Sequence, residues 1–146
     1  MMIECKPTKL DWEDYSSDLD KAYAYEKFND LSGVEAQKMF LRDLMPRVAD
    51  LESMPIKPFQ YYFIAYQDFL LNKVYGRFDK PDVANCYLSV IENKLKNSPE
   101  FIFPIMERLI DSINFVAENQ AFFEAEEKYY GNFKDRVSEI RAQVTK

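Results

Sequence analysis

The feature that most restricts the fold is the way three glycines and seven prolines divide the sequence into pieces of helical length. Each glycine stands where a helical pattern begins or stops, and apolar residues between these breaks recur every three to four positions. That spacing is typical of an amphipathic helix, because residues three and four apart share one helix face. No stretch alternates apolar and polar residues with the β-branched enrichment of a strand. The sequence therefore predicts an all-α fold, a bundle of about six helices.

The predicted helices cover, in approximate bounds, residues 17–29, 33–48, 59–75, 84–95, 105–130 and 132–144. Ser32 and Glu35 form a capping box at the start of the second helix, in which Pro46 must produce a kink or a split because proline lacks an amide donor. The second helix should turn these residues inward: Val34, Phe40, Leu41, Leu44 and Val48. The third is predicted to be the buried central helix, closed by Gly76. The fifth would be the longest, about 40 Å at 1.5 Å per residue.

Acidic residues are concentrated at the start of the sequence. Residues 1–36 hold nine acidic and four basic side chains, so most of the net charge of −6 lies in the first quarter of the chain. A length of 146 residues suits one domain. We therefore predict a single helical domain over residues 1–146 with an acidic N-terminal segment, 1–36.

Several kinds of chemistry are excluded by the residues that are missing. The chain has no histidine, which excludes Ser-His-Asp and Cys-His nucleophile systems and His-ligated metals. The three glycines are too far apart for a phosphate-binding loop. Cys5 and Cys86 are too few for a zinc site or a disulfide framework and are expected to be reduced thiols, a redox role for either being left open. We therefore predict that the chain is not an enzyme and that it binds neither a metal nor a cofactor.

A surface that binds another protein is the function class that the remaining features favour. Acidic surfaces attract basic proteins and disfavour nucleic acid, and aromatic residues beside acids are typical of interfaces. Each of these features also has a structural explanation. Trp12 could instead pin the N-terminal arm to the helices, and each acidic cluster could be an ordinary solvent-exposed face. The candidate partner-binding residues are Asp11, Trp12, Glu13, Asp14, Tyr15, Asp18, Asp20, Glu124, Glu126 and Glu127.

Two weaker patterns indicate other functions. A stripe of oxygen-bearing side chains is spaced for one helix face, and a Glu-x-x-Glu pair follows it, as in helical sites that hold Mg²⁺ or Mn²⁺. These residues are Glu107, Asp111, Asn114 and Glu118, then Glu124 and Glu127. The stripe is predicted to lie opposite the apolar face of its helix. An ordinary solvent-exposed helix face therefore explains this stripe as well as a metal site does. The basic C-terminal piece, 128–146, could touch nucleic acid, which the acidic chain as a whole disfavours.

The segments DWEDYSSDLD at 11–20 and AENQAFFEAEEKYYGNF at 117–133 give the chain a resemblance to the small α-helical immunity proteins of bacterial toxin–immunity systems, including contact-dependent growth inhibition. The resemblance is one of type: size, acidity, helical content and aromatic residues. It implies a non-enzymatic inhibitor that neutralises a dedicated basic toxin, such as a nuclease domain, by covering its active site with an acidic surface.

A helical regulatory or scaffolding oligomer and a carboxylate-metal enzyme are the alternatives to this function. No run approaches the length of a membrane span, and the first residues lack the apolar core of a signal peptide. We therefore expect a cytoplasmic protein without membrane contact. The partner's identity, its docking surface and the oligomeric state stay open.

Overall fold

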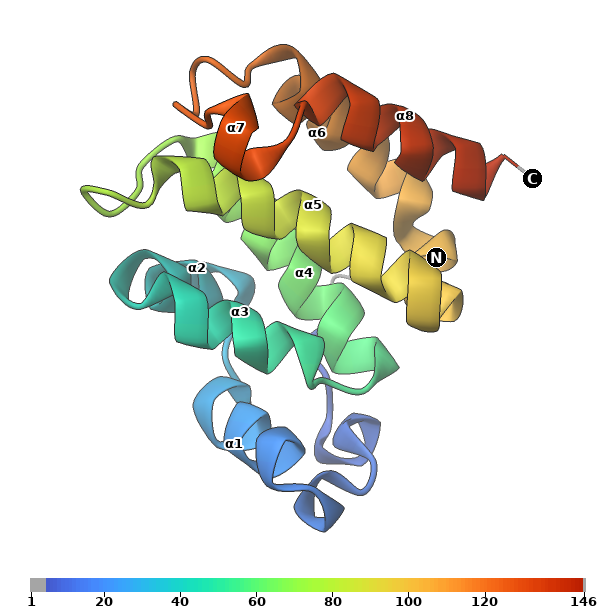
Figure 1. The fold of residues 1–146 in the computed structure, drawn as a ribbon. Coiled ribbons are helices and arrows are strands. Elements are labelled where there is room, and N and C mark those ends of the chain that lie inside the picture. Colours follow the sequence, from blue (N-terminus) through green and yellow to red (C-terminus); the bar gives the residue numbers. More distant parts are fainter. Residues whose placement is uncertain (1–4, 146) are drawn as a thin grey trace. The chain divides into compact units, whose positions relative to one another are not determined.

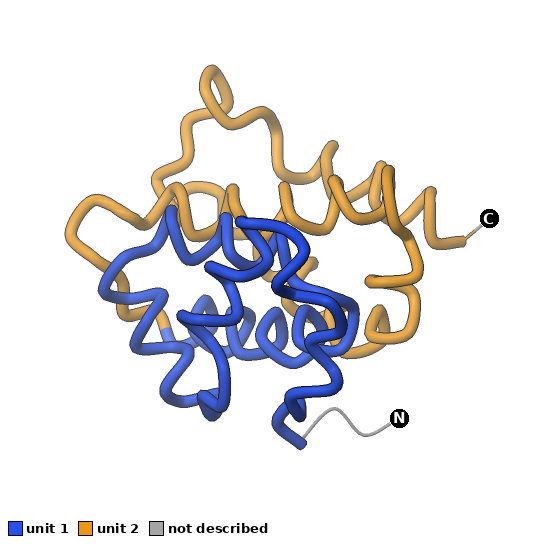
Figure 2. Tube along the Cα trace, turned by 90° about the horizontal axis from the view of Figure 1, so that it is seen from below, with its two compact units in different colours: residues 1–72 blue, residues 73–146 orange. Residues whose placement is uncertain are grey.

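A computed structural model describes residues 5–145 of the chain. Helical residues make up 75%, and residues 5–145 contain no strand, which confirms the all-α prediction. The residues group into two compact units, 1–72 and 73–146 (Figure 2). The predicted single domain over 1–146 stays a prediction, and Glu4 of the acidic N-terminal segment lies outside the described residues.

Unit 1 is built around an aromatic helix core. Helix α4 packs against α2 and α3, and α1 packs against α3 (Figure 1). The Tyr62 hydroxyl lies 2.8 Å from the carbonyl oxygens of both Phe28 and Leu31, so this ring ties α4 to the end of α1. The elements of unit 1 are η1 (Lys9–Trp12), η2 (Tyr15–Ser17), α1 (Leu19–Phe28), α2 (Gly33–Arg42), α3 (Leu44–Glu52) and α4 (Ile56–Asn72).

The capping box of α2 is confirmed. The Glu35 amide donates to the Ser32 hydroxyl at 3.1 Å, and the Ser32 amide donates to the Glu35 carboxylate at 2.8 Å. The contact with the Ser32 backbone amide holds the pKa of the Glu35 carboxyl below its usual value. Both orphan donors of the helix start are therefore satisfied.

The predicted second helix is split into α2 and α3. The break falls at Asp43, so that Pro46 occupies the first turn of α3, where an amide has no intrahelical acceptor and proline is tolerated. Two residues predicted to face inward are exposed, Val34 at 64% and Leu41 at 40%, because the buried face of α2 is formed by Ala36 and Phe40.

Gly76 does not close the central helix, contrary to the prediction. Helix α4 stops at Asn72 because Lys73 takes a left-handed conformation with φ at 61°. Gly76 instead opens the turn that leads into the next helix, and the Asp79 amide donates to its carbonyl at 3.0 Å. A Cβ at position 76 would lie 2.6 Å from the Asp79 carboxylate. A side chain at this position would therefore make the Asp79 carboxylate move, and the role of Gly76 lies in this turn rather than in helix termination.

Unit 2 is a bundle in which α8 packs against both α5 and α6 (Figure 1). The apolar residues that recur at helical spacing are buried in both α5 and α6; they are Ala84, Tyr87, Leu88, Ile91 and Leu95 in α5, and Leu109, Ile113 and Val116 in α6. The Asn132 side chain caps α8 at the predicted start of the last helix, accepting from the Asp135 amide at 2.9 Å. The elements of unit 2 are α5 (Lys80–Asn97), η3 (Pro99–Phe101), η4 (Phe103–Ile105), α6 (Met106–Glu118), α7 (Glu127–Tyr130) and α8 (Phe133–Val144).

The predicted long helix over 105–130 is wrong, because α6 ends at Glu118 and a loop leads to the short α7. The loop is held by Gln120, whose amide nitrogen donates to the carbonyls of Ala125 and Gly131, each at 2.8 Å. The Gln120 amide oxygen accepts from the Phe133 amide at 2.8 Å. The divided second and fifth helices account for the eight α-helices found in residues 5–145, where about six were predicted.

The guanidinium of Arg136 on α8 connects this helix to α5 and to the end of α7. Its Nε and Nη2 bind the Glu92 carboxylate at 3.0 and 2.6 Å. Nη1 donates to Asn85 Oδ1 at 2.8 Å and to the Tyr130 carbonyl at 2.9 Å, and Nη2 donates to Ser89 Oγ at 3.1 Å. A forked arginine–carboxylate pair of this kind fixes geometry as well as adding energy. We call this cluster the Arg136 junction.

Candidate protein-binding site

Two of the N-terminal acids have structural roles. Asp18 caps α1, accepting from the amides of Asp20 at 2.7 Å and Lys21 at 3.1 Å. Asp11 accepts from the Thr8 amide at 2.8 Å and lies 3.6 Å from the Lys57 ammonium. The hydrogen bond from the Thr8 backbone lowers the pKa of the Asp11 carboxyl. These two carboxylates are used for folding η1 and α1.

The two N-terminal aromatic candidates face inward. The Trp12 side chain has no exposed surface and packs edge-on against Tyr25, with ring centres 5.3 Å apart. Tyr15 is half-buried, and its ring stacks on the ring of Tyr25 with the two ring centres 3.8 Å apart. Trp12 therefore pins the N-terminal arm in this structure and offers no surface to a partner.

Substituting Asp18 with alanine should destabilise α1 by about 1 kcal/mol, the usual cost of removing an N-cap side chain. Thermal unfolding followed by circular dichroism measures this loss. Asp14→Ala is the matched control, because Asp14 precedes η2 without a side-chain capping bond. Equal losses from both substitutions would contradict the capping role.

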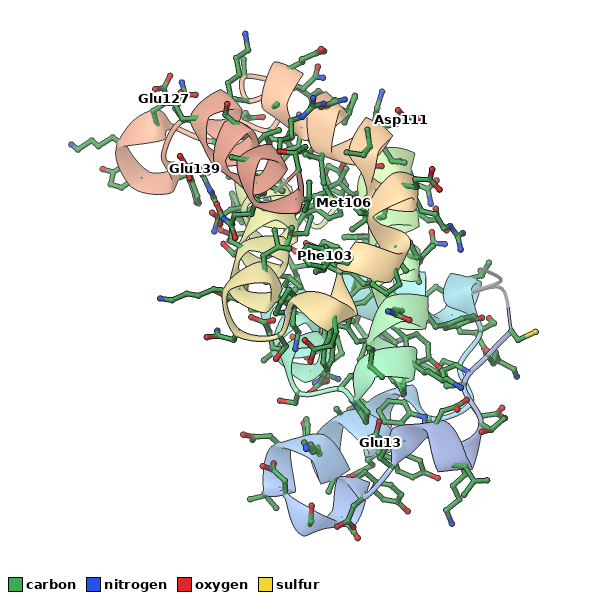
Figure 3. All side chains as sticks on the ribbon, turned by 90° about the vertical axis from the view of Figure 1, so that its right-hand side faces the viewer. Glu13, Phe103, Met106, Asp111, Glu127 and Glu139 are labelled. Atoms are coloured by element: carbon green, nitrogen blue, oxygen red, sulfur yellow. The ribbon has the colours of Figure 1, made fainter. Side chains whose placement is uncertain are left out.

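The remaining acids of residues 10–20 are exposed, as are two leucines of this segment that sequence reasoning missed. Leu10 is 89% exposed and Leu19 is 87% exposed. Glu13, labelled in Figure 3, lies just after η1 with φ at 54°. We give the name N-terminal acidic face to five exposed residues of this segment whose side chains form no capping hydrogen bond: Leu10, Glu13, Asp14, Leu19 and Asp20. The one sequence signal for the exposure of these two leucines is that they stand beside helix-capping residues and outside any helical apolar stripe.

A pocket between α1 and α3 adjoins this face at Asp20. It has a volume of about 280 Å³ and is lined by Asp20, Tyr23, Pro46, Ala49, Asp50 and Ser53. Asp50 is only 5% exposed, and its Oδ2 lies 2.9 Å from Nε of the equally buried Arg47. Burial raises the pKa of Asp50 to about 6, because the nearby Arg47 charge offsets only part of the desolvation. Nothing in the sequence pattern marked Asp50.

The second acidic cluster lies in unit 2, on the loop that replaces the predicted long helix. Glu124, Glu126 and Glu127 line an open pocket of about 600 Å³. Glu124 lies 3.4 Å from the Lys80 ammonium, and Glu127 accepts from Asn132 at 3.1 Å. The structure thus brings these three predicted residues together, with two of the three carboxylates already in contact with unit 2 side chains.

The carboxylates of the two predicted metal patterns do not converge. Asp111 on α6 and Glu127 on α7 lie far apart in Figure 3, and Asn114 accepts a hydrogen bond from Arg141. Within residues 5–145, no three Asp, Glu or Cys side chains are grouped so that they could hold a metal ion. Within residues 5–145 neither the exposed Cys5 nor the buried Cys86 forms a disulfide.

Comparison of the chain with protein-family models, with curated proteins and with solved structures found no match. The helices of residues 5–145 do not include one with the length and apolar character needed to cross a membrane.

Proposed function

We propose that the chain is a non-enzymatic inhibitor that binds a basic partner protein through the N-terminal acidic face, as a cytoplasmic immunity protein does when it neutralises a toxin. The observation that carries this proposal is the separation of the acids into two groups. Asp11 and Asp18 cap local structure, whereas Glu13, Asp14 and Asp20 form no capping hydrogen bond, and Leu10 and Leu19 of the same segment are almost fully exposed.

The composition of the face suits such a partner. Exposed carboxylates steer a basic protein toward the face and raise the association rate. Each leucine that becomes buried on binding would contribute through its apolar area. Acids alone would give steering without a contact that holds the complex, and leucines alone would give no preference for a basic partner.

A binding experiment with a charge-matched control tests the proposal. The partner is captured from native cells with the tagged chain, and association is measured for the triple variant Glu13→Gln, Asp14→Asn, Asp20→Asn. The control is Glu107→Gln, Asp111→Asn, Glu118→Gln, which removes the same charge from exposed positions of α6. We expect the on-rate and its salt dependence to fall for the first variant alone, because steering depends on charges near the docking surface.

Equal on-rates for the two triple variants would show that only net charge matters and would contradict a docking role for the face. In that case, the pocket lined by Glu124, Glu126 and Glu127 is the next surface to neutralise. An unaltered circular dichroism spectrum for both variants is required, and it is expected because none of the six carboxylates caps a helix.

A scaffolding or regulatory oligomer is the second candidate, favoured by the turn at 76–79. Phe78 is 79% exposed there, and the Arg77 guanidinium lies 5.2 Å from its ring centre. An aromatic ring and an arginine on a tight turn are common in protein interfaces. Sedimentation velocity over a range of concentrations tests this candidate, which predicts a sedimentation coefficient that rises with concentration.

A further inference from the structure

Helix α1 contacts α3 through charged and aromatic side chains as well as apolar ones. The Tyr23 ring of α1 has a cation from each helix beside it, with Lys27 Nζ 5.3 Å and Arg47 Cζ 5.8 Å from the ring centre. The same Arg47 side chain contacts Asp50 of its own helix. The polar groups of this contact are therefore matched by cations of the chain itself, and Arg47 lies against both helices.

The Arg47–Asp50 pair is buried in this contact. Each of the two side chains is only 6% exposed, and Arg47 Nε lies 2.9 Å from Asp50 Oδ2. Neither atom forms a hydrogen bond within residues 5–145, so the two charges touch without the alignment of a hydrogen bond. Both groups have lost hydration, and their mutual attraction restores only part of that free energy.

Helix α1 covers Asp50 on one side. The pocket beside Asp50 is lined by Asp20 and Tyr23 from α1, and its other walls come from α3 and from Ser53 directly after α3. Movement of α1 away from α3 would therefore admit water to the Asp50 carboxylate. Such a movement exposes little of the core, because α1 has two buried residues where α4 has eleven.

The charges with the largest effect on Asp50 come from α1, from α3 and from the residue before α3. Lys27 and Arg47 supply positive charge, and Asp20 and Asp43 supply negative charge. Burial outweighs the two cations and raises the pKa of Asp50 to about 6. Helices α2 and α4 also pack against α3, and their charged residues have smaller effects on the Asp50 pKa: Glu35, Lys38 and Arg42 on α2, and Lys57 and Asp68 on α4.

We propose that the buried Arg47–Asp50 pair makes the attachment of α1 depend on pH, with α1 opening from α3 more readily at neutral pH than at pH 5. Opening returns the ionised Asp50 carboxylate to water, whereas a protonated carboxyl gains much less from hydration. At pH 5 the closed state holds a proton that the open state, with an ordinary carboxyl pKa of 3.8, has lost. The proton therefore stabilises the closed state at pH 5, and this stabilisation is lost as the pH rises through the folded pKa of about 6.

The attachment of α1 matters for the N-terminal acidic face, because Leu19 and Asp20 of that face lie on this helix. Leu10 belongs to η1, which packs against α4 instead. Opening of α1 would therefore change the arrangement of the face, and would do so more often at neutral pH. The inference uses contacts within unit 1 alone and does not rest on the proposed function.

Native-state hydrogen exchange measures the opening of α1 directly. Protection factors, which divide out the intrinsic pH dependence of exchange, are recorded at pH 5 and pH 7.5 for amides 24–28 in α1 and 62–66 in α4. We expect the α1 amides to be less protected than the α4 amides at both pH values, because α1 opens without unfolding the α4 core. The α1 protection factors should fall about tenfold from pH 5 to pH 7.5, the ratio that pKa values of about 6 and 3.8 give.

Two variants and a titration make the result specific. Asp50→Asn should remove the pH dependence, since asparagine binds no proton in this range, and Glu26→Gln, which removes an exposed acid of α1, should leave it. The carboxyl ¹³C titration of Asp50 in the wild-type protein needs no substitution, and its midpoint should lie at a pH of about 6.

Each of four outcomes would overturn the inference. Three are equal α1 protection at the two pH values, a tenfold fall that persists in Asp50→Asn, and a carboxyl midpoint at about pH 4, the ordinary value for an aspartate. The fourth is α1 protection equal to that of α4, because α1 would then open only when the whole of unit 1 unfolds.

Discussion

Replacing Arg136 with alanine is expected to lower the free energy of unfolding by about 3 kcal/mol, because it breaks a largely buried, hydrogen-bonded ion pair. The substitution removes all five hydrogen bonds of the Arg136 junction. It also leaves the Glu92 carboxylate, 32% exposed, without its cation. Urea unfolding followed by circular dichroism measures the loss as a lower midpoint at unchanged slope.

Two further variants make this result specific. Arg136→Lys keeps the charge but loses the fork, and we expect it to recover less than half of the loss. Lys134→Ala is the matched control, since Lys134 is exposed on the same helix. A midpoint for Arg136→Ala as high as that of the control would show that the junction contributes nothing measurable.

Relative to wild type, Asp50→Asn is expected to gain about 3 kcal/mol of unfolding free energy between pH 4 and pH 8, the free energy that corresponds to the pKa shift of Asp50. The pKa of this buried carboxyl is about 6 in the folded protein and 3.8 in its unperturbed state. A raised pKa means that the folded state keeps a proton that the unfolded state loses above about pH 4, so stability falls as the pH rises toward 6 and the cost is complete above the folded pKa. That cost disappears as the pH falls from about 7 to about 4.

The measurement is the difference in unfolding free energy between Asp50→Asn and wild type from pH 4 to pH 8. The difference should grow with pH and level off above the folded pKa. Glu26→Gln removes an exposed acid of α1 and should show no such trend. A variant that is less stable than wild type at pH 8 would show that the Arg47 ion pair outweighs the burial of Asp50.

Local signals in the sequence predicted those parts of the fold that local chemistry determines. The Ser32–Glu35 box occurs where it was expected, and the last helix begins at the predicted residue 132, because a helix start needs only residues within one turn. The end of α6 was missed, because it depends on Gln120 reaching Gly131 and Phe133, more than ten positions along the chain. Periodicity cannot show a contact of that kind.

The candidate site was predictable only as a region. The acids of residues 11–20 are concentrated in the sequence, but which of them cap helices depends on backbone geometry at Thr8 and Asp20. The burial of Trp12 depends on Tyr25 and Tyr62, which come from other helices. Asp50 has no sequence signal, since a buried acid in an amphipathic helix looks like any other polar position.

The separation between capping acids and exposed acids has a consequence for how such a protein can diversify. Asp11 and Asp18 are constrained by folding, so substitutions there carry a stability cost whatever the partner. Leu10, Glu13, Asp14 and Leu19 have no comparable constraint in the structure. A lineage under pressure to follow a changing partner could therefore rewrite the exposed positions one at a time and acquire a new preference without first losing its fold.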